Sequence, residues 1–534
     1  MKLRRLQIFD IEYKPLMKGV DIFFTKSTND SINVNCLVGV NGSGKSQLLE
    51  LISEIFLFLD KVYRKQGILS KKINSPFAFK IEYEITINEI LYLVSFECEK
   101  IHTKPKDILF EIIQEDIPGL VIDTSEIVNY LPNKVIGYTS GDNETLSLPF
   151  EWYYDEYADF TGKRARFPEK YKEFNDYDPV LYFMNYNTNL GITISNLIFD
   201  DGNDALKLVK DIVRVEKLIS FRITIQTNQK MAPGYKPKGG PDAGIKLTEE
   251  LENWIDKLIK CCKYAVQDEN DKKFKRWILD YELDPITIDL FKIHFSSALE
   301  LYTAFYKLEL LNNLIIKDEI VKDIKRARDE RLNTALQLVP KLPTVPDEEK
   351  VLRYSELKLM LKNGTTVDYL SLSDGEHQFL NVFGTILMMI NQENCLFLLD
   401  EPETHFNPKW RRIFISTLKE MTIGKIQDMI VTTHSPFVVS DCKNESVFIF
   451  ERDGDCLRIT NPPKETYGAS FDNILDMAFD IKIPISRDSL KEIDELRKYQ
   501  NPDVIKEKLN NFGESDEKLN LMNRIIMLNF GKEK

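Results

Sequence analysis

Several features that define other classes of protein are missing from this chain of 534 residues. No window of about 18 residues is apolar and free of charge, so the sequence predicts no membrane-spanning helix. The N-terminal segment has two arginines but no apolar run of the length that a secretory signal needs. Basic residues are not in excess, since 71 Lys and Arg stand against 84 Asp and Glu, a net charge of −13. This balance argues against a protein that coats DNA through bulk charge, but it leaves room for a local basic groove.

Cysteine pairs of the kind that bind metals or form a disulfide framework are also lacking. The seven cysteines are an odd number at irregular spacing, without a CxxC pair, and several lie within apolar runs. The five histidines form neither an HxxxH pair nor a cluster with cysteine. We therefore expect reduced, buried thiols in a cytoplasmic protein.

What is present is the composition of a globular chain with a sizeable core. Hydrophobic residues make up 43% and aromatic residues 11% of the sequence. The length predicts about three domains, or one large domain with an insertion. The pattern of elements predicts an α/β fold in four segments. These are 1–150 with strands, a glycine loop and a helix; 151–350 with helices at 204–220, 247–266, 287–316 and 317–337; 351–475 with alternating helices and strands; and a helical tail at 476–534.

A glycine-rich loop connects an apolar strand, Ile32–Gly39, to an amphipathic helix. Its sequence, GVNGSGKS, fits the phosphate-binding pattern G-x-x-x-x-G-K-S. Glycines let backbone N–H groups turn inward around phosphates, Lys45 reaches the β- and γ-phosphates, and Ser46 offers a hydroxyl to Mg²⁺. The predicted ATP-binding residues are Gly39, Asn41, Gly42, Ser43, Gly44, Lys45, Ser46 and Gln47.

Two further apolar strands end in polar side chains. Leu396–Glu401 (LFLLDE) ends in two carboxylates, of which Asp400 is expected to hold Mg²⁺ and Glu401 to orient or deprotonate the attacking water. Ile430–His434 (IVTTH) ends in His434, which is expected to bond the γ-phosphate. His405 follows the acidic pair, and it either lines the site or a subunit interface or is an ordinary loop histidine.

A helix begins at the segment Ser373-Asp374-Gly375-Glu376. Ser373 is a good N-cap, and Glu376 stands three residues later, as a capping box requires. Taken alone, this segment predicts a well-capped helix and nothing more. Its place between the phosphate loop and the acidic strand suggests a second role.

The four motifs together resemble those of the ABC ATPases, in the order of that superfamily. Leu372–Glu376 (LSDGE) is similar to the LSGGQ signature, with Asp for a Gly and Glu for Gln. The resemblance implies an ABC ATPase head, with a mixed or parallel sheet and an antiparallel β subdomain, and a head-to-tail homodimer or higher oligomer with ATP and Mg²⁺ between subunits. Ser373 and Gly375 would then contact the γ-phosphate held by the other subunit. The family's Q-loop glutamine has no match, and Val135–Ser147 occupies the corresponding place.

The spacing narrows the resemblance to the SMC, RecF and OLD-like branch. Lys45 and Asp400 lie 355 residues apart, which implies a large helical insertion, and DEPETHFNP is similar to the OLD-like form. The sequence after His434 shows no strand-end Glu followed by a D-x-D strand, the pattern of the nuclease domain that OLD proteins carry. Its one D-x-D stretch, Asp453-Gly454-Asp455, is typical of a hairpin turn. A separate ATPase of this size resembles the Septu-type (PtuA-like) anti-phage ATPases, including versions linked to retrons. That resemblance implies a separate HNH-type nuclease partner and, for retron-linked versions, a reverse transcriptase with its RNA and DNA.

Two other functions stay open from the sequence. One is a RecF- or SMC-like ATPase that binds DNA directly in repair or chromosome maintenance, and the other is a scaffold that ATP only locks together. The loop Gln229–Lys246, rich in Gly, Pro and Lys, is either a surface loop or a basic contact. Direct binding would need a continuous basic groove, for instance from Lys207, Lys210, Lys236, Lys238, Lys322, Lys325 and Arg326.

Overall fold

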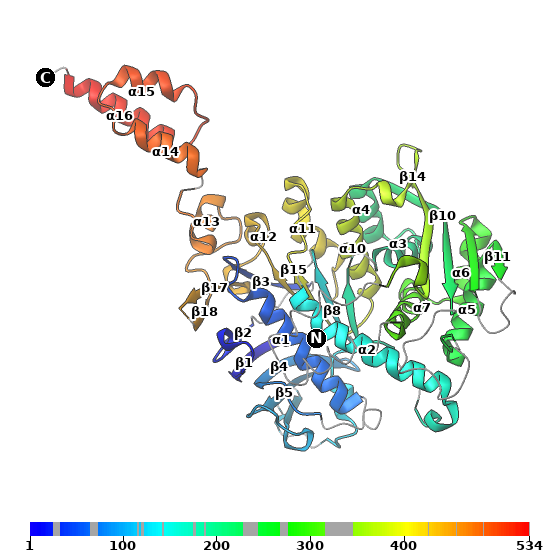
Figure 1. Ribbon diagram of the computed structural model, residues 1–534. Coiled ribbons are helices and arrows are strands. Elements are labelled where there is room, and N and C mark those ends of the chain that lie inside the picture. The colour runs from blue at the N-terminus through cyan, green and yellow to red at the C-terminus, as the bar shows by residue number, and fades with distance from the viewer. Residues whose placement is uncertain are drawn as a thin grey trace. The chain divides into compact units, whose positions relative to one another are not determined.

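The computed structural model in Figure 1 describes most of the chain. The described residues are 1–24, 32–64, 73–114, 117–118, 122–140, 144–174, 178–185, 188–227, 244–267, 276–315, 345–425, 427–454, 456–483 and 485–532. They form two compact units, Met1–Ala469 and Ser470–Lys534.

A seven-stranded sheet forms the centre of the first unit (Figure 1). Its order is β18-β17-β3-β16-β15-β8-β9, and every pairing is parallel except the β17–β18 hairpin. The bounds are β3 Asn33–Gly39, β8 Lys134–Thr139, β9 Leu181–Met184, β15 Cys395–Asp400, β16 Asp428–Thr432, β17 Val447–Asp453 and β18 Cys456–Thr460. All residues of β3, β15 and β16 are buried, as expected for parallel strands covered on both faces. The predicted α/β class is therefore confirmed.

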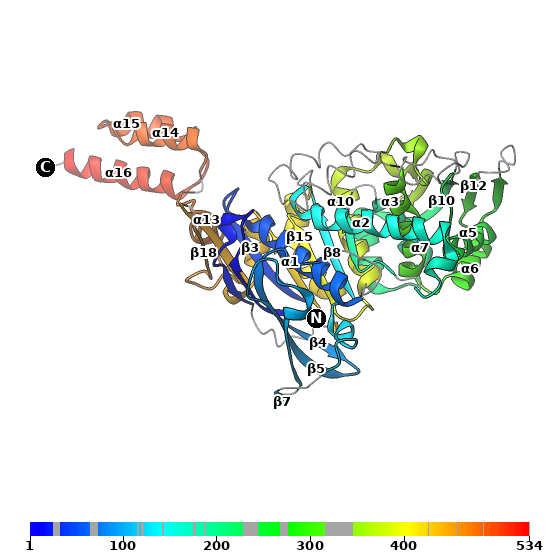
Figure 2. The same cartoon turned by 60° about the horizontal axis from the view of Figure 1, so that its bottom comes forward.

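A second, antiparallel sheet lies beside the helix that follows the glycine loop (Figure 2). Its order is β2-β1-β4-β5-β6-β7, with β1 Lys2–Asp10, β2 Asp21–Phe23, β4 Ala78–Ile87, β5 Ile90–Cys98, β6 Leu109–Gln114 and β7 Ile117–Pro118. Asn88 and Glu89, with φ values of 51° and 67°, form the two-residue turn of the β4–β5 hairpin.

Helix α1, Lys45–Leu59, fills the space between these two sheets. One side contacts β3, β8, β15 and β16, while Phe56 packs edge-on against Tyr83 of β4 at 5.7 Å between ring centroids. Contact on both sides explains why nearly the whole helix is buried rather than one face of it, Glu50 and Glu54 included. The glycine loop is therefore joined to a helix that both sheets hold in place.

The remaining helices of the first unit cover the seven-stranded sheet or belong to the middle of the chain. Those near the sheet are α2 Glu144–Arg166, α3 Asn189–Ile198, α10 Asp374–Met389, α11 Pro408–Met421 and α12 Pro436–Ser440. Those of the middle segment are α4 Asp204–Val213, α5 Glu249–Cys261, α6 Pro285–His294 and α7 Ala298–Leu310.

The middle segment contains strands β10, β11 and β12, which the sequence analysis missed, and they share a sheet with the β13–β14 hairpin of the next segment. A five-stranded antiparallel sheet has the order β11-β12-β10-β13-β14, with β10 Val215–Gln226, β11 Tyr264–Gln267, β12 Arg276–Glu282, β13 Leu352–Leu361 and β14 Thr366–Asp368. The helices predicted at 204–220 and 247–266 are therefore too long, and the expectation of a wholly helical insertion is wrong. Arg214, with φ 59°, ends α4 in the left-handed region, and the alternating residues after it pair with β12 and β13.

Two other predictions for this segment have different outcomes. The stretch 287–316 forms two helices rather than one, because Ser297 caps a new helix by accepting from the Glu300 N–H. The helix predicted at 317–337 lies outside the described residues, as does most of the Gly- and Pro-rich loop Gln229–Lys246.

In its described residues the second unit contains helices and no strand, as predicted for the tail. They are α13 Phe471–Phe479, α14 Arg487–Leu496, α15 Pro502–Leu509 and α16 Asp516–Lys532. Its small core contains Ile493, Leu496, Ile505, Leu509 and Leu521. Among the helices of the described residues, none has the length and apolar character that crossing a membrane requires. All seven cysteines are free, and the prediction of buried thiols is confirmed for five of them, with Cys262 partly exposed and Cys456 exposed.

A fully buried ammonium in α7 ties the middle segment together. The Lys307 side chain has no exposed surface and pairs with Asp178 at 2.8 Å and with Glu250 of α5. We expect Lys307→Ala to lower the free energy of unfolding by about 2 kcal/mol, because it removes a fully buried cation that bonds two partly exposed carboxylates. Lys263→Ala, which breaks the exposed pair with Glu282, should cost much less. Urea titration of both variants measures the difference, and equal losses would contradict this account.

Candidate functional site

The register of the parallel strands aligns the ends of four strands in one row. Leu37 of β3 pairs with Thr432 of β16, Thr432 pairs with Asp400 of β15, and Asp400 pairs with Thr139 of β8. In open α/β sheets, ligands bind beyond the carboxyl ends of the strands. The loops that follow these four residues therefore border one site, which contains the predicted glycine loop, acidic pair and histidine.

The glycine loop has the backbone that its sequence predicts. Gly44 is the N-cap of α1 with φ 98°, and a Cβ there would lie 2.4 Å from Met17 Cε. At Gly39, with φ 144°, a Cβ would lie 2.4 Å from the Phe450 carbonyl oxygen. Both positions therefore exclude any residue with a side chain. Lys45 Nζ donates to the carbonyl oxygens of Gly39 at 2.9 Å and Val40 at 3.2 Å, which holds the ammonium across the loop.

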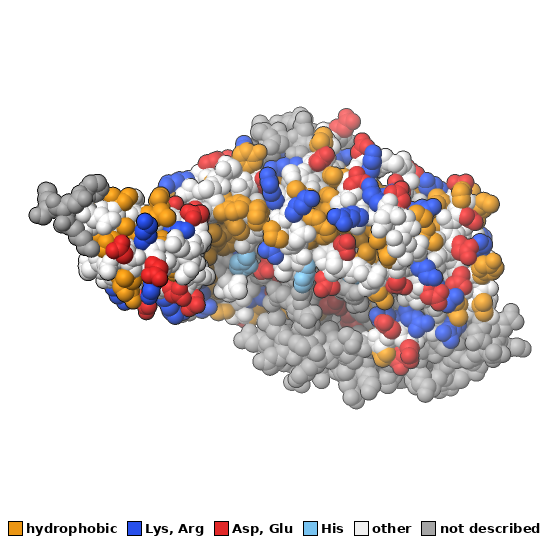
Figure 3. All heavy atoms as spheres, turned by 90° about the horizontal axis from the view of Figure 1, so that it is seen from above, with side chains coloured by type: hydrophobic (Ala, Val, Ile, Leu, Met, Phe, Trp, Pro, Cys, Tyr) orange, Lys and Arg blue, Asp and Glu red, His pale blue; other side chains and the backbone are white. Residues whose placement is uncertain are grey.

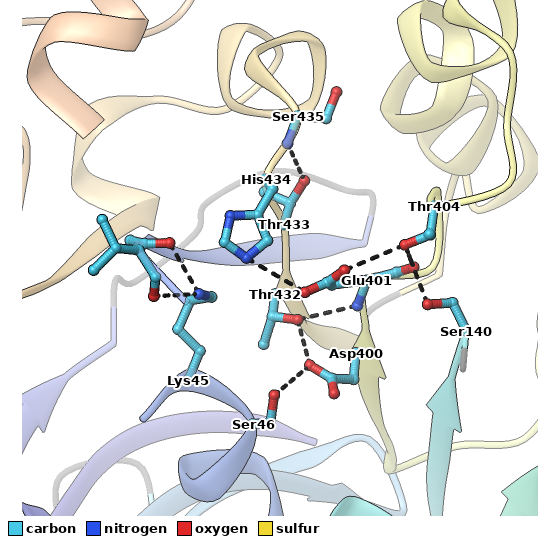
Figure 4. Close-up of polar contacts among 12 residues, drawn as sticks. Lys45, Ser46, Ser140, Asp400, Glu401, Thr404, Thr432, Thr433, His434 and Ser435 are labelled. Atoms are coloured by element: carbon cyan, nitrogen blue, oxygen red, sulfur yellow. Dashed lines mark hydrogen bonds and ion pairs between the residues drawn. The ribbon is translucent and has the colours of Figure 1, made fainter. Parts of the chain in front are cut away.

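A hydroxyl and a carboxylate face one another at the start of α1 (Figure 4). Ser46 Oγ donates to Asp400 Oδ1 at 2.9 Å, and Thr432 Oγ1 donates to the same oxygen at 2.5 Å. Oxygen donors of this kind suit Mg²⁺, which binds through one or two side chains together with phosphates and water. The buried Ser43 Oγ has no hydrogen-bond partner among the described residues, as expected for a loop built to meet a ligand. These residues thus fit Mg²⁺ and a nucleotide phosphate.

Glu401 has a backbone conformation that the sequence analysis did not predict. Its φ of 49° lies in the left-handed region, which is uncommon outside glycine and is found at functional sites. Its N–H donates to Thr432 Oγ1 at 3.0 Å, which fixes this turn at the end of β15. The carboxylate consequently points toward His434, whose Nε2 lies 3.3 Å from Glu401 Oε1 (Figure 4).

Charges within the site act on one another. The hydrogen bond from His434, helped by the nearby Lys45, lowers the pKa of Glu401 below its ordinary value. Burial lowers the pKa of Lys45, although the neighbouring Glu401 and Asp400 oppose this effect. Glu401 is therefore ionised at neutral pH, as a group that accepts a proton from water must be.

The segment after Glu401 joins the site to helix α10. Thr404 and Ser140 hydroxyls lie 3.1 Å apart, and His405 Nε2 lies 3.3 Å from the Ser140 carbonyl oxygen. The His405 N–H donates to Gln378 Oε1 of α10 at 2.9 Å. His405 thus belongs to the surroundings of the site rather than to a detached loop. Ser140 follows β8 in the stretch where a Q-loop is expected, of which 141–143 lie outside the described residues.

The predicted capping box at the start of α10 is confirmed. Ser373 accepts from the Glu376 N–H, while Glu376 Oε2 accepts from the Ser373 N–H at 2.8 Å. A Cβ on Gly375 would lie 2.9 Å from the His405 carbonyl oxygen, so this signature-like segment packs tightly on the loop after Glu401. Among the described residues, no hydrogen bond or ion pair joins Ser373, Asp374, Gly375 or Glu376 to the glycine loop. The structure therefore brings together all predicted site residues except these four.

Three residues of this site were not predicted, namely Thr432, Thr433 and Glu403. Thr432 bonds both Asp400 and the Glu401 N–H, and Thr433 bonds the buried Glu403. The sequence signal was present in the pair of threonines before His434. Side chains alternate along a strand, so Thr432 faces the site beside Asp400, while Thr433 faces the opposite side, where Glu403 lies.

Comparison with known proteins gives a matching family model and a long relative. Residues 266–440 match the family described as "AAA domain, putative AbiEii toxin, Type IV TA system". The "Retron Vc95 probable ATPase" of Vibrio cholerae serotype O1 biovar El Tor is 24% identical over 493 residues, 89% of this chain and 78% of that protein. The chain is an ATPase that resembles the ABC/AAA type.

Two other similarities are more limited. "Protein ea59" of Escherichia phage lambda is 29% identical to this ATPase over 100 residues, 19% of each chain. The solved "SMC head domain from Thermotoga maritima" is 11% identical, with a TM-score of 0.30 over 86% of this chain and 99% of that chain. The α/β class of the head follows from the sheet order and the glycine loop alone.

The Ser46–Asp400 contact generates a test of the metal site. We expect Asp400→Asn to lower ATP turnover on the order of 100-fold. The substitution removes the negative charge that would hold Mg²⁺, and Mg²⁺ would stabilise the charge that develops on the phosphate in the transition state. Ser46→Ala should act in the same direction and raise the Mg²⁺ concentration needed for half-maximal turnover. Asp123→Asn changes an exposed carboxylate that bonds Ser125 and serves as the control. Mg²⁺ titrations of phosphate release measure the effect, and unchanged Mg²⁺ dependence in both site variants would refute the assignment.

Proposed function

We propose that this ATPase closes as a head-to-tail homodimer around ATP and Mg²⁺ and thereby controls a separate nuclease in a bacterial anti-phage defence system of the retron or Septu type. Each subunit would supply the glycine loop, Asp400 and Glu401 to one nucleotide. The other subunit would supply Ser373, Asp374, Gly375 and Glu376 to the same nucleotide.

The position of the signature-like segment is the observation that carries this proposal. Ser373 and Asp374 are exposed at the N-terminus of α10, a helix of 16 residues. A helix N-terminus presents free N–H groups and partial positive charge, which favours a phosphate. Within one chain the adjacent Gly375 packs on the segment after Glu401, where a Cβ would lie 2.9 Å from the His405 carbonyl oxygen. A phosphate held by a second copy would complete the ligand set on both sides.

The geometry supports distinct roles for the residues of the site. Lys45 and the N–H groups of the loop would bind the phosphates, and Ser46 and Asp400 would hold Mg²⁺, which neutralises charge on the phosphates when bound. Glu401 would orient and deprotonate the attacking water, because it is ionised and points into the site. His434, held against Glu401, would contact the γ-phosphate once ATP draws Glu401 toward the water.

The defence role is supported by the relatives rather than by the site geometry. The long relative is named as the probable ATPase of a retron, and the matched family model is described by a toxin of a toxin–antitoxin system. The resemblance to Septu-type ATPases adds an HNH-type nuclease as the expected partner, with a reverse transcriptase and its RNA and DNA in the retron case.

Direct DNA binding through a basic groove receives little support from the described surface. Of the seven basic residues that would form the groove, Lys207 and Lys210 are described and the other five lie outside the described residues. Lys210 pairs with Asp200 at 2.8 Å. A hollow of about 420 Å³ beside Glu376 is lined by Arg214 and Lys409 but also by Asp211 and Glu376. On the face shown in Figure 3, Lys and Arg likewise alternate with Asp and Glu.

Loss of the Glu401 carboxylate should trap the closed dimer. We expect Glu401→Gln to bind Mg-ATP but hydrolyse it at least about 100-fold more slowly, so ATP stays between the subunits. Light scattering after gel filtration should then give twice the mass of the nucleotide-free protein. Glu451→Gln, on an exposed strand position, should turn over ATP normally. A monomer at saturating Mg-ATP would contradict the dimer, and unchanged turnover would favour the locked scaffold.

The partner can be found by purifying the chain from its native operon. We expect a nuclease subunit to travel with this ATPase and the Glu401→Gln variant to change its cleavage of plasmid DNA. Mass spectrometry of the purified complex identifies the partner. Purification of the ATPase alone from cells that express every gene of the operon would contradict the defence proposal, while leaving the ATPase assignment intact.

A further inference from the structure

A third carboxylate, Glu403, is buried in the segment that follows the acidic pair. It stands two residues after Glu401 and is 3% exposed, although charged side chains are rarely buried without a partner. The chain turns at Glu401, with φ 49°, and the two carboxylates then have different neighbours, Glu401 the His434 ring and Glu403 the Thr433 hydroxyl. Burial raises the pKa of Glu403 to about 7. A buried carboxyl costs folding free energy that an apolar residue of similar size would not, which points to a role other than stability.

Among the residues that the structure describes, Glu403 has one side-chain hydrogen-bond partner, Thr433, which directly precedes His434. Thr433 Oγ1 bonds Glu403 Oε1 and also accepts from the Ser435 N–H at 2.9 Å. Since the threonine oxygen accepts from Ser435, its hydroxyl hydrogen goes to Glu403. Thr433 is itself fully buried, so the bond is shielded from water. The second carboxyl oxygen of Glu403 is buried and has no hydrogen-bond partner among the described residues.

Thr433 lies between the two residues that touch the catalytic carboxylates. Thr432 bonds Asp400 and the Glu401 N–H, and His434 Nε2 lies 3.3 Å from Glu401 Oε1. Residues 432 and 434 face the site, while 433 faces Glu403, as alternation along an extended chain requires. The hydrogen bond to Glu403 that holds Thr433 should therefore also orient the side chains of Thr432 and His434, and that of His434 in particular.

From this geometry we propose that Glu403 is a positioning residue for ATP hydrolysis, acting through Thr433 to hold His434 against Glu401. Its role rests on the proposed function, because it concerns the orientation of the groups assigned there to hydrolysis. Glu403 is buried and bonds Thr433 rather than a group of the glycine loop, so its removal should change the rate of the chemical step rather than ATP binding.

Variants that remove the Glu403–Thr433 bond test the proposal. We expect Thr433→Val, which deletes the hydroxyl and keeps the shape, to lower kcat about 10- to 100-fold, since a displacement of about 1 Å in a catalytic group has an effect of that size. KM for ATP should change less than about threefold, because phosphate-loop contacts remain. Glu403→Leu should show the same split, whereas Glu403→Gln and Thr433→Ser keep an acceptor and a donor and should retain most of kcat.

A double-variant series separates positioning from general destabilisation. In a His434→Ala background, Thr433→Val should lower kcat by less than about threefold more, because the group that it positions is already gone. Asp428→Asn is the matched control, since Asp428 is a buried carboxylate on the same strand, at the opposite end from the site. It should lower the melting temperature without lowering kcat of the folded protein.

The outcomes distinguish this inference from the proposed function. If Glu401→Gln abolishes turnover while folded Thr433→Val keeps kcat within about threefold of the parent, only the positioning role of Glu403 fails. Full additivity of Thr433→Val with His434→Ala would overturn it as well. If Glu401→Gln turns over normally, the assignment of the site fails first. Should Glu403→Leu not fold, Thr433→Val alone decides the question, because it leaves Glu403 in place.

Discussion

The site depends on one constraint, the parallel register that places Leu37, Thr432, Asp400 and Thr139 in a single row across four strands. A slip of one residue in β15 would turn the Asp400 side chain to the other face of the sheet and separate it from Ser46. Such a slip is opposed because β3, β15 and β16 are buried on both faces, with α1 wedged against them from the side of the second sheet. Packing far from the nucleotide thus sets the geometry of the groups that would bind it.

The middle segment, whose sequence contains no recognised motif, packs directly on the signature-like helix α10. Asn189 of α3 donates to the His377 carbonyl oxygen at 2.9 Å, and Asn196 donates to that of Gly384 at 3.0 Å. A Cβ on Gly384 would lie 2.8 Å from Ile192, so α3 and α10 approach as closely as a glycine allows. Residues inserted between the glycine loop and Asp400 therefore form the platform for α10. A partner that shifted this platform would shift Ser373 relative to the second nucleotide, which offers a physical route from partner binding to ATP turnover.

The parts of the site that are encoded locally were predictable, and the parts that depend on tertiary contacts were not. The glycine loop, the acid-ending strand and the capping box each follow from a short run of residues, and the structure contains all three. The left-handed turn at Glu401 depends on a hydrogen bond from its N–H to Thr432 of another strand, so the residues around Glu401 in the sequence do not predict it. Strand β10 was hidden because the helical pattern of α4 runs directly into it, and its pairing partners lie up to 146 residues away along the chain, as for Val215 and Leu361.

The central claim is that each nucleotide site is completed by a second copy of the chain, and mixing two inactive variants tests it most directly. Lys45→Ala disables the phosphate loop, and Ser373→Arg disables the signature-like segment, so each protein alone should hydrolyse almost no ATP. A mixed dimer would contain one site with an intact loop from one subunit and an intact signature from the other. We predict that mixing restores turnover, up to about a quarter of the parent value if the subunits exchange freely and the sites act independently. Turnover that stays at the level of the separate variants, in a mixture shown to contain mixed dimers, would contradict the account.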